Sequence, residues 1–127
     1  MSGNDILIDT NILLYFLNGD KDVKKFFIDY NPIISFITEL EVLSSPELTD
    51  DDKANIGHLL NGLTILTYND KHKQAVLNIR AAKRLKLPDA IIAATAITAG
   101  IPLVTADESF KNTKSLHTIF YRPVINE

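Results

Sequence analysis

The sequence contains no cysteine, so disulfides and thiolate metal sites are excluded, and we expect a reducing compartment such as the cytoplasm. It also lacks any apolar run of about 18 residues, which predicts that no segment spans a membrane. The first residues, MSGNDILID, have no basic region before their apolar stretch, so we expect no secretory signal. Glycine and proline number only five each, which argues against a disordered chain.

Positive charge is also scarce, because 13 Lys and Arg residues stand against 16 Asp and Glu residues and give a net charge of −3. This balance does not indicate a general binder of polyanions, so any nucleic-acid binding must come from a local basic surface. With 127 residues, 46% of them hydrophobic, the chain has the size of one globular domain. We therefore expect a single domain over residues 1–127.

Short apolar runs alternate with helical patterns along the whole chain. Strands are expected at 6–9, 33–35, 63–67, 103–105 and 118–121. Helices are expected at 10–17, 20–30, 36–45, 49–61, 69–85 and 88–99. Because the strands are short and apolar and alternate with helices, we predict an α/β fold with a central parallel sheet covered on both faces.

Asp9 interrupts an apolar run, ILIDTNILLYFL, at the point where a strand gives way to a helix. Ligands of parallel sheets bind at the carboxyl ends of the strands, where this aspartate lies. Polar residues also close two other predicted strands, Ser35 on one and Thr105 with Asp107 on the other. A purely structural interpretation remains open, since aspartate is a favoured cap for the helix that follows.

Three further acids are candidates for the same site, and each also has a structural explanation. Asp89 begins a helix that is apolar nearly all round, where the helix dipole alone favours an acid. Asp107 lies just past a strand, where a turn role is the simpler explanation. Glu41 and Glu39 point about 160° apart on a helix, so one cleft can take only one of them, and periodicity does not choose.

The acids taken together indicate a chemistry that none of them indicates alone. Carboxylates that are brought together repel, which raises their pKa values and destabilises the fold. A hard divalent cation such as Mg²⁺ removes that cost, because it prefers oxygen ligands. One or two such ions held by an acidic cluster can orient and activate a water for in-line attack at phosphorus.

Four stretches occur in a fixed order, IDTN, SFITELE, PDAIIAATA and VTADESF, and FYRP follows them. In these stretches the chain resembles PIN-domain ribonucleases, most closely the VapC-type toxins of toxin–antitoxin pairs. The resemblance implies a three-layer sandwich with helices around a parallel sheet of four or five strands. It implies Mg²⁺- or Mn²⁺-dependent cleavage of single-stranded or looped RNA, leaving 3′-hydroxyl and 5′-phosphate ends. It also implies a homodimer, silenced by a small antitoxin protein that covers the site.

The resemblance assigns metal-binding and catalytic roles to four acids. Asp9 matches the first acid, with Asn11 as the polar residue that accompanies it. Asp89 matches the third acid, and Asp107 matches the fourth, with Thr105 as the hydroxyl beside the site. These residues would bind one or two ions of Mg²⁺ or Mn²⁺.

The second acid is Glu41, because the family spacing S-x-x-T-x-x-E places Ser35, Thr38 and Glu41 and so selects Glu41 over Glu39. One position departs from the family pattern. Relatives often carry another acid where this chain has Ser109. If the second ion depends on that acid, this protein holds one metal firmly and the second only with RNA bound.

A basic face on the helix expected at 69–85 is the candidate RNA-binding surface. Lys73, Arg80 and Arg84 fall within about 40° of arc on that helix, and Lys83 lies on a nearby arc. Such a grouping suits phosphate contacts. The alternative is the ordinary solvated face of an amphipathic helix.

Aromatic side chains of the first two helices could stack on bases, pack in the core, or form a groove for a partner helix. They are Tyr15, Phe16, Phe26, Phe27 and Tyr30. Two alternative functions also stay open. One is a catalytically inactive PIN-like domain that binds RNA or a partner. The other is an aspartate-nucleophile phosphatase, although that chemistry requires an acid at position 11, which is asparagine here.

Overall fold

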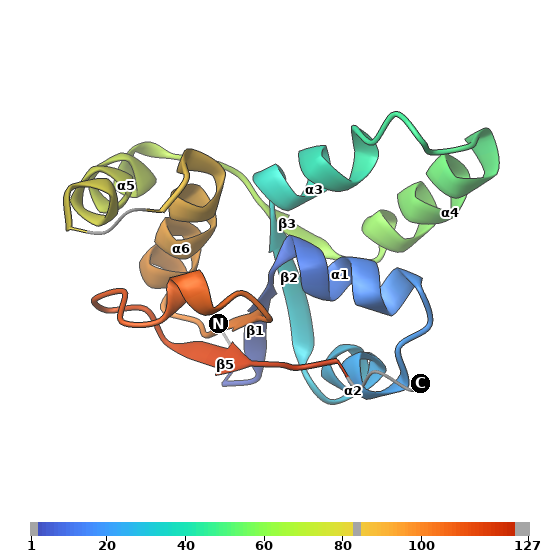
Figure 1. Cartoon of the computed structure of the whole chain (residues 1–127), viewed down its shortest axis with the longest axis horizontal. Coiled ribbons are helices and arrows are strands. Elements are labelled where there is room, and N and C mark those ends of the chain that lie inside the picture. The colour runs from blue at the N-terminus through green and yellow to red at the C-terminus, as the bar shows by residue number, and fades with distance from the viewer. Residues whose placement is uncertain (1–2, 83–84, 124–127) are drawn as a thin grey trace.

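The computed structural model describes residues 3–82 and 85–123, and Figure 1 shows how their elements are arranged. The strands are β1 (Asp5–Ile8), β2 (Asn31–Ser35), β3 (Thr64–Leu66), β4 (Leu103–Thr105) and β5 (Thr118–Phe120). The helices are α1 (Thr10–Leu17), α2 (Lys21–Asp29), α3 (Phe36–Leu43), α4 (Asp50–Asn61), α5 (Asp70–Ala82) and α6 (Leu87–Ala99). A short 3₁₀ helix, η1 (Glu108–Phe110), follows β4.

Every strand and helix expected from the sequence is present, and the α/β prediction is confirmed. The largest difference concerns the helix expected at 69–85, because Asn69 is not helical and the described helix α5 covers Asp70–Ala82. Residues 83 and 84 lie outside the described residues, and Leu85 is not helical. The 3₁₀ helix η1 was not predicted, because three residues are too few to produce a periodic pattern.

The five strands form one parallel sheet in the order β3-β2-β1-β4-β5, which confirms the prediction of four or five parallel strands. From β1 the chain moves outward to β2 and β3, then returns to β4 on the other side of β1. The strand order therefore reverses between β1 and β4. In open parallel sheets, this switch point at the carboxyl ends of the strands is where ligands bind.

Helices cover both faces of the sheet, so the three-layer sandwich is confirmed (Figure 1). Alternate residues of β1 point to opposite faces, as the pleat requires. Leu7 packs with the buried side chains of α5 and α6, whereas Ile6 and Ile8 pack with those of α1, α2 and α4. Each face of the sheet thus has its own apolar core.

Helix α6 is the most deeply buried helix of the first core. Its buried residues run from Ala90 through Ala96, apart from the half-buried Ile91, and its alanines allow close packing with α5. Gly100 ends the helix in a left-handed conformation (φ 69°), which costs glycine little. Across the described ranges, no helix is both long and apolar enough to cross a bilayer.

Candidate active site

Asp9 follows β1 directly and is buried, with only 4% of its surface exposed. Its Oδ1 accepts a hydrogen bond from the backbone N–H of Thr10 at 2.8 Å, and this bond caps α1. Its Oδ2 accepts a 2.6 Å hydrogen bond from the hydroxyl of Thr105 at the end of β4. The structural interpretation of Asp9 as a cap is therefore right, and the cap lies at the switch point of the sheet.

The environment of Asp9 raises the pKa of its carboxyl group to about 6. Burial is the largest cause, because it disfavours the ionised form. The hydrogen bonds from Thr105 and Thr10 oppose the shift, while the negative charges of Asp89 and Asp107 add to it. A buried carboxylate with two acidic neighbours is a local excess of negative charge.

Asp107 follows β4, the strand that pairs with β1, and so lies at the same end of the sheet as Asp9. Its backbone N–H donates to the Thr105 hydroxyl at 3.0 Å, so Thr105 donates to one candidate acid and accepts from the other. One carboxylate oxygen of Asp107 accepts from the N–H of Ser109 at 2.9 Å and caps η1. The turn role considered for Asp107 is therefore present, and it leaves the residue close enough to raise the pKa of Asp9.

Asp89 lies in the first turn of α6 with a half-buried side chain. Burial raises its pKa, and the charges of Asp107 and Glu41 raise it further, whereas Lys86 acts in the opposite direction. Asp89 therefore interacts electrostatically with each of the other three candidate acids. This links four segments that are far apart in the sequence.

Glu41 lies on the exposed side of α3, and its carboxylate accepts a 2.8 Å hydrogen bond from the hydroxyl of Thr10. The same hydroxyl lies 3.0 Å from that of Thr38, which is fully buried on α3. Helical periodicity did not choose between Glu39 and Glu41. The structure places Glu41 beside the residue that follows Asp9.

The other supporting residues differ in how they relate to the acids. Ser35 is buried, and its hydroxyl caps α3 by accepting from the N–H groups of Ile37 and Thr38. Its contacts are those of a helix cap. Asn11 is exposed on the first turn of α1. Thr10, which the sequence did not single out, contacts two of the four acids.

The four acids are gathered at one corner without being closed around a common point. Among residues 3–82 and 85–123, none of them forms an ion pair within 4 Å. In the same part of the chain, no three acidic, histidine or cysteine side chains are arranged closely enough to hold a metal ion. The all-oxygen donor set and the excess charge suit a hard divalent cation, although the coordination geometry is not formed.

The predicted RNA-binding residues are only partly described. Lys73 and Arg80 are exposed on α5, whereas Lys83 and Arg84 lie outside the described residues. The guanidinium of Arg80 donates to the backbone carbonyl of Leu85, which ties the end of α5 to the segment before α6. Arg80 therefore has a structural contact, and its role in RNA binding stays a prediction.

Most of the aromatic side chains of α1 and α2 pack against the core. Phe16 and Phe27 stack with ring centroids 3.9 Å apart, and Tyr15 and Phe26 both contact the ring of Tyr121. These four aromatic residues of α1 and α2 are half-buried against the second apolar core. Core packing is therefore their main role, whereas Tyr30, just after α2, is 40% exposed.

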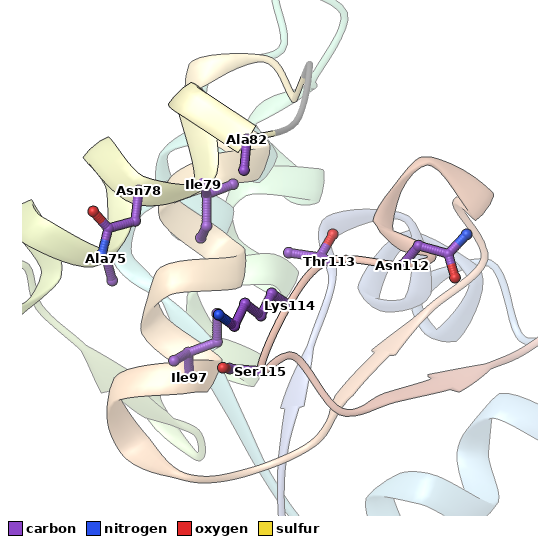
Figure 2. Close-up of a pocket in the computed structure, with 9 residues that line it drawn as sticks. All are labelled: Ala75, Asn78, Ile79, Ala82, Ile97, Asn112, Thr113, Lys114 and Ser115. Atoms are coloured by element: carbon purple, nitrogen blue, oxygen red, sulfur yellow. The ribbon is translucent and has the colours of Figure 1, made fainter.

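A separate hollow of about 450 Å³ lies between α5, α6 and the segment that precedes β5. Figure 2 shows the side chain of Lys114 lying across this hollow toward Ile97 of α6. The lining residues are Ala75, Asn78, Ile79, Ala82, Ile97, Asn112, Thr113, Lys114 and Ser115. None of the four candidate acids lines it, so the hollow is distinct from the acidic corner.

The family model for the PIN domain matches residues 6–116. The chain belongs to the PIN-domain family. The matched range contains all four acids of the corner, Asp9, Glu41, Asp89 and Asp107. No curated protein matches the sequence significantly.

Solved structures share the fold of this PIN domain over almost its whole length. A chain of a toxin–antitoxin complex from Klebsiella pneumoniae matches with a TM-score of 0.81 at 25% identity, covering 94% of this chain and 99% of that chain. A chain of VapBC2 from Rickettsia felis, bound to a DNA fragment from their promoter, matches with a TM-score of 0.83 at 20% identity, covering 93% and 99%. A chain of DNA-bound VapBC from Salmonella typhimurium gives 0.80 at 20% identity, covering 91% and 97%.

Proposed function

We propose that this PIN domain is a metal-dependent endoribonuclease and the toxin of a toxin–antitoxin pair. One observation carries the proposal. Four carboxylates from four distant segments interact at the switch point of a parallel sheet, and the pKa of the buried Asp9 is raised to about 6. Such a corner is costly unless a cation compensates it.

In this proposal Asp9, Glu41, Asp89 and Asp107 would hold one or two ions of Mg²⁺ or Mn²⁺. A bound ion would supply the Lewis acidity that activates water and offsets the charge of a phosphodiester under attack. Asp9 is the fixed member of the set, since Thr10 and Thr105 hold both of its oxygens. The more exposed carboxylates of Asp89 and Asp107 would turn toward it.

Thr105 would connect Asp9, which follows β1, with Asp107, which follows β4. Its single proton is donated to Asp9, and its oxygen accepts from the N–H of Asp107. This arrangement holds β4 and the segment after it in register with the end of β1. Ser109, where relatives often have an acid, donates its N–H to Asp107 and adds no charge, so we propose that one ion is held more firmly than the second.

Four further proposals accompany this one, on domain organisation, location, partners and RNA contacts. We propose that residues 1–127 form one domain, that the protein acts in the cytoplasm, and that it forms a homodimer. Solved structures with this fold include toxin–antitoxin complexes, so the proposed partner is a small antitoxin protein. We further propose that Lys73 and Arg80 contact the RNA backbone, together with Lys83 and Arg84.

A second function, binding of RNA or a partner without catalysis, is favoured by one observation. In the described residues no three acids are close enough to chelate an ion. The aspartate-nucleophile phosphatase is disfavoured because position 11 is Asn11 and because the PIN model spans residues 6–116. Cleavage is therefore the property that must be measured.

The test is incubation of the purified protein with total RNA in Mg²⁺ or in EDTA, followed by sequencing of the cut ends. We expect Mg²⁺-dependent cuts with 5′-phosphate and 3′-hydroxyl ends. The Asp29→Asn variant, which removes a carboxylate at an exposed position on α2 and outside the acidic corner, should cut like the wild type. A protein that binds Mn²⁺ yet cuts no RNA would favour the non-catalytic function.

A further inference from the structure

Thr10 is the residue that connects two of the four acids, and it does so with two different groups. Its backbone N–H donates to Asp9 at 2.8 Å, and its side-chain hydroxyl donates to Glu41 at 2.8 Å. The residue opens α1, so both contacts arise where β1 gives way to that helix. A change of its side chain would disturb Glu41 and leave the bond to Asp9 in place.

The number of protons on each hydroxyl decides which group donates in the contacts among Thr38, Thr10 and Glu41. A threonine hydroxyl has one proton, and an ionised carboxylate can only accept hydrogen bonds. Since Thr10 donates its proton to Glu41, the 3.0 Å contact with Thr38 requires Thr38 to be the donor. The result is a directed chain from the buried Thr38, through Thr10, to the exposed carboxylate of Glu41.

This series of hydrogen bonds matters because Glu41 is the most exposed of the four acids. An exposed glutamate has several freely rotating bonds, and fixing such a side chain costs conformational entropy. Thr38 lies one turn before Glu41 on α3, and its hydroxyl is anchored by burial. The hydroxyl of Thr10, at the start of α1, therefore restrains the Glu41 side chain of α3 on the side where Asp9 lies.

We propose that Thr10 is a positioning residue, whose hydroxyl holds the Glu41 carboxylate at the edge of the acidic corner for binding a divalent cation. This inference rests on the proposed function, since it assumes that the corner binds a metal. Residues that orient metal ligands typically change metal affinity by about 10–100-fold when they are removed. The same size of effect is expected here.

The test compares Thr10→Val, which keeps the shape and removes the hydroxyl, with Thr10→Ser, which keeps the hydroxyl. Mn²⁺ affinity is measured without RNA by the electron paramagnetic resonance signal of free Mn²⁺. Thr10→Val should bind Mn²⁺ about 10–100-fold more weakly than the wild type, whereas Thr10→Ser should stay within about 3-fold of it. Cleavage by Thr10→Val should recover at saturating Mn²⁺, because in this proposal the hydroxyl acts only through Glu41 and metal binding.

A double-mutant comparison separates positioning from a general structural role. In a Glu41→Gln background, Thr10→Val should cause little further loss of Mn²⁺ affinity, because the carboxylate that it holds is gone. An equal loss in both backgrounds would overturn the inference, and so would wild-type affinity in Thr10→Val. Urea unfolding of each variant checks that the fold is intact.

The outcomes also distinguish this inference from the proposed function. Wild-type protein that binds Mn²⁺ but cuts no RNA contradicts the nuclease alone. Wild-type protein that binds and cuts, with Thr10→Val unchanged in both properties, contradicts the role of Thr10 alone. Wild-type protein that binds no Mn²⁺ contradicts both.

Discussion

Asp9 and Asp20 are both aspartates that cap a helix, α1 and α2 respectively, yet their carboxyl groups have opposite pKa shifts. Asp20 accepts hydrogen bonds from the N–H groups of Asp22 and Val23, each at 3.0 Å, and from the hydroxyl of Tyr121 at 2.8 Å. These bonds lower its pKa, with the bond from Val23 contributing most. The pKa of Asp9 is raised to about 6 by burial.

The two corners differ in what satisfies the charge. At the corner between α1 and α2, the protein itself supplies donors, and Tyr121 ties the chain after β5 to that corner. Burial, followed by the bond to Asp20, raises the pKa of Tyr121 to about 12, so the hydroxyl remains a donor at neutral pH. At the corner after β1, further acids surround Asp9. Both aspartates cap a helix, so capping alone does not distinguish them. The groups around each carboxylate do: Asp20 has hydrogen-bond donors around it, whereas Asp9 has further acids beside it.

The largest expected effect is on catalysis. Asp9→Asn should reduce Mg²⁺-dependent RNA cleavage by about 1,000-fold or more, because a metal site supplies several kcal/mol of stabilisation to the developing charge. Asp20→Asn should change cleavage by less than about 3-fold, since Asp20 belongs to the other corner and asparagine also caps helices. Initial rates on a fluorescent RNA measure both variants, and equal rates for Asp9→Asn and wild type would show that the site is misassigned.

The next effect is on stability in the absence of metal, where Asp9 should be a liability. Its folded-state pKa of about 6 lies above the ordinary value of 3.8, so keeping it ionised in the folded protein costs free energy at neutral pH. Asp9→Asn should therefore raise the free energy of unfolding at pH 7 by up to about 3 kcal/mol. Urea unfolding in EDTA measures the difference.

The difference in free energy of unfolding between wild type and Asp9→Asn should depend on pH. Between about pH 4 and pH 6 the folded wild type binds more protons at Asp9 than the unfolded chain does, so this contribution to stability falls as pH rises. Asp9→Asn should remove that fall, and the two proteins should become similar in stability below about pH 4. A destabilised Asp9→Asn protein at pH 7 in EDTA would contradict the burial argument.

Asp20→Ala should have the opposite effect on stability. It removes the cap of α2 and leaves the Tyr121 hydroxyl without its acceptor, which together should lower the free energy of unfolding by about 1–2 kcal/mol at pH 7. Because the folded-state pKa of Asp20 is lowered, its contribution is present above the unfolded value and disappears as pH falls through the folded value. Urea unfolding of wild type and variant across this pH range tests the prediction.

Tyr121→Phe is the smallest change, because it removes only the hydroxyl. One hydrogen bond to a charged group should be lost, which lowers the free energy of unfolding by about 1 kcal/mol. RNA cleavage at saturating Mg²⁺ should stay at the wild-type rate, since Tyr121 contacts the corner that contains Asp20. A large loss of cleavage would mean that the two corners are coupled.

Local features of the fold were predictable from the sequence because local chemistry decides them. Helix α1 occupies residues 10–17 as expected, since Asp9 is a strong cap at one end and Asn18-Gly19 ends the pattern at the other. The end of α5 was less predictable. The pattern predicts a helix as far as Leu85, but Leu85 is not helical, and its backbone carbonyl accepts a hydrogen bond from the guanidinium of Arg80.

The contacts within the site were not predictable from residue patterns alone, because they depend on strand order. Asp9 and Thr105 are 96 positions apart, and they meet only because β1 pairs with β4. Alternation of strands and helices predicts a parallel sheet without fixing which strands are neighbours. The role of Thr10 was missed for the same reason, since its partner Glu41 lies 31 positions away on α3.

The most direct test of a metal site built around Asp9 is the number of protons released when Mn²⁺ binds. Binding requires an ionised carboxylate, and Asp9 with a pKa of about 6 is half-protonated at pH 6. Calorimetric titrations with Mn²⁺ in buffers of different ionisation enthalpy should show release of about half a proton or more at pH 6 and almost none at pH 8. The Asp9→Asn protein should bind far more weakly, whereas equal Mn²⁺ affinity in wild type and Asp9→Asn would contradict the assignment of this corner.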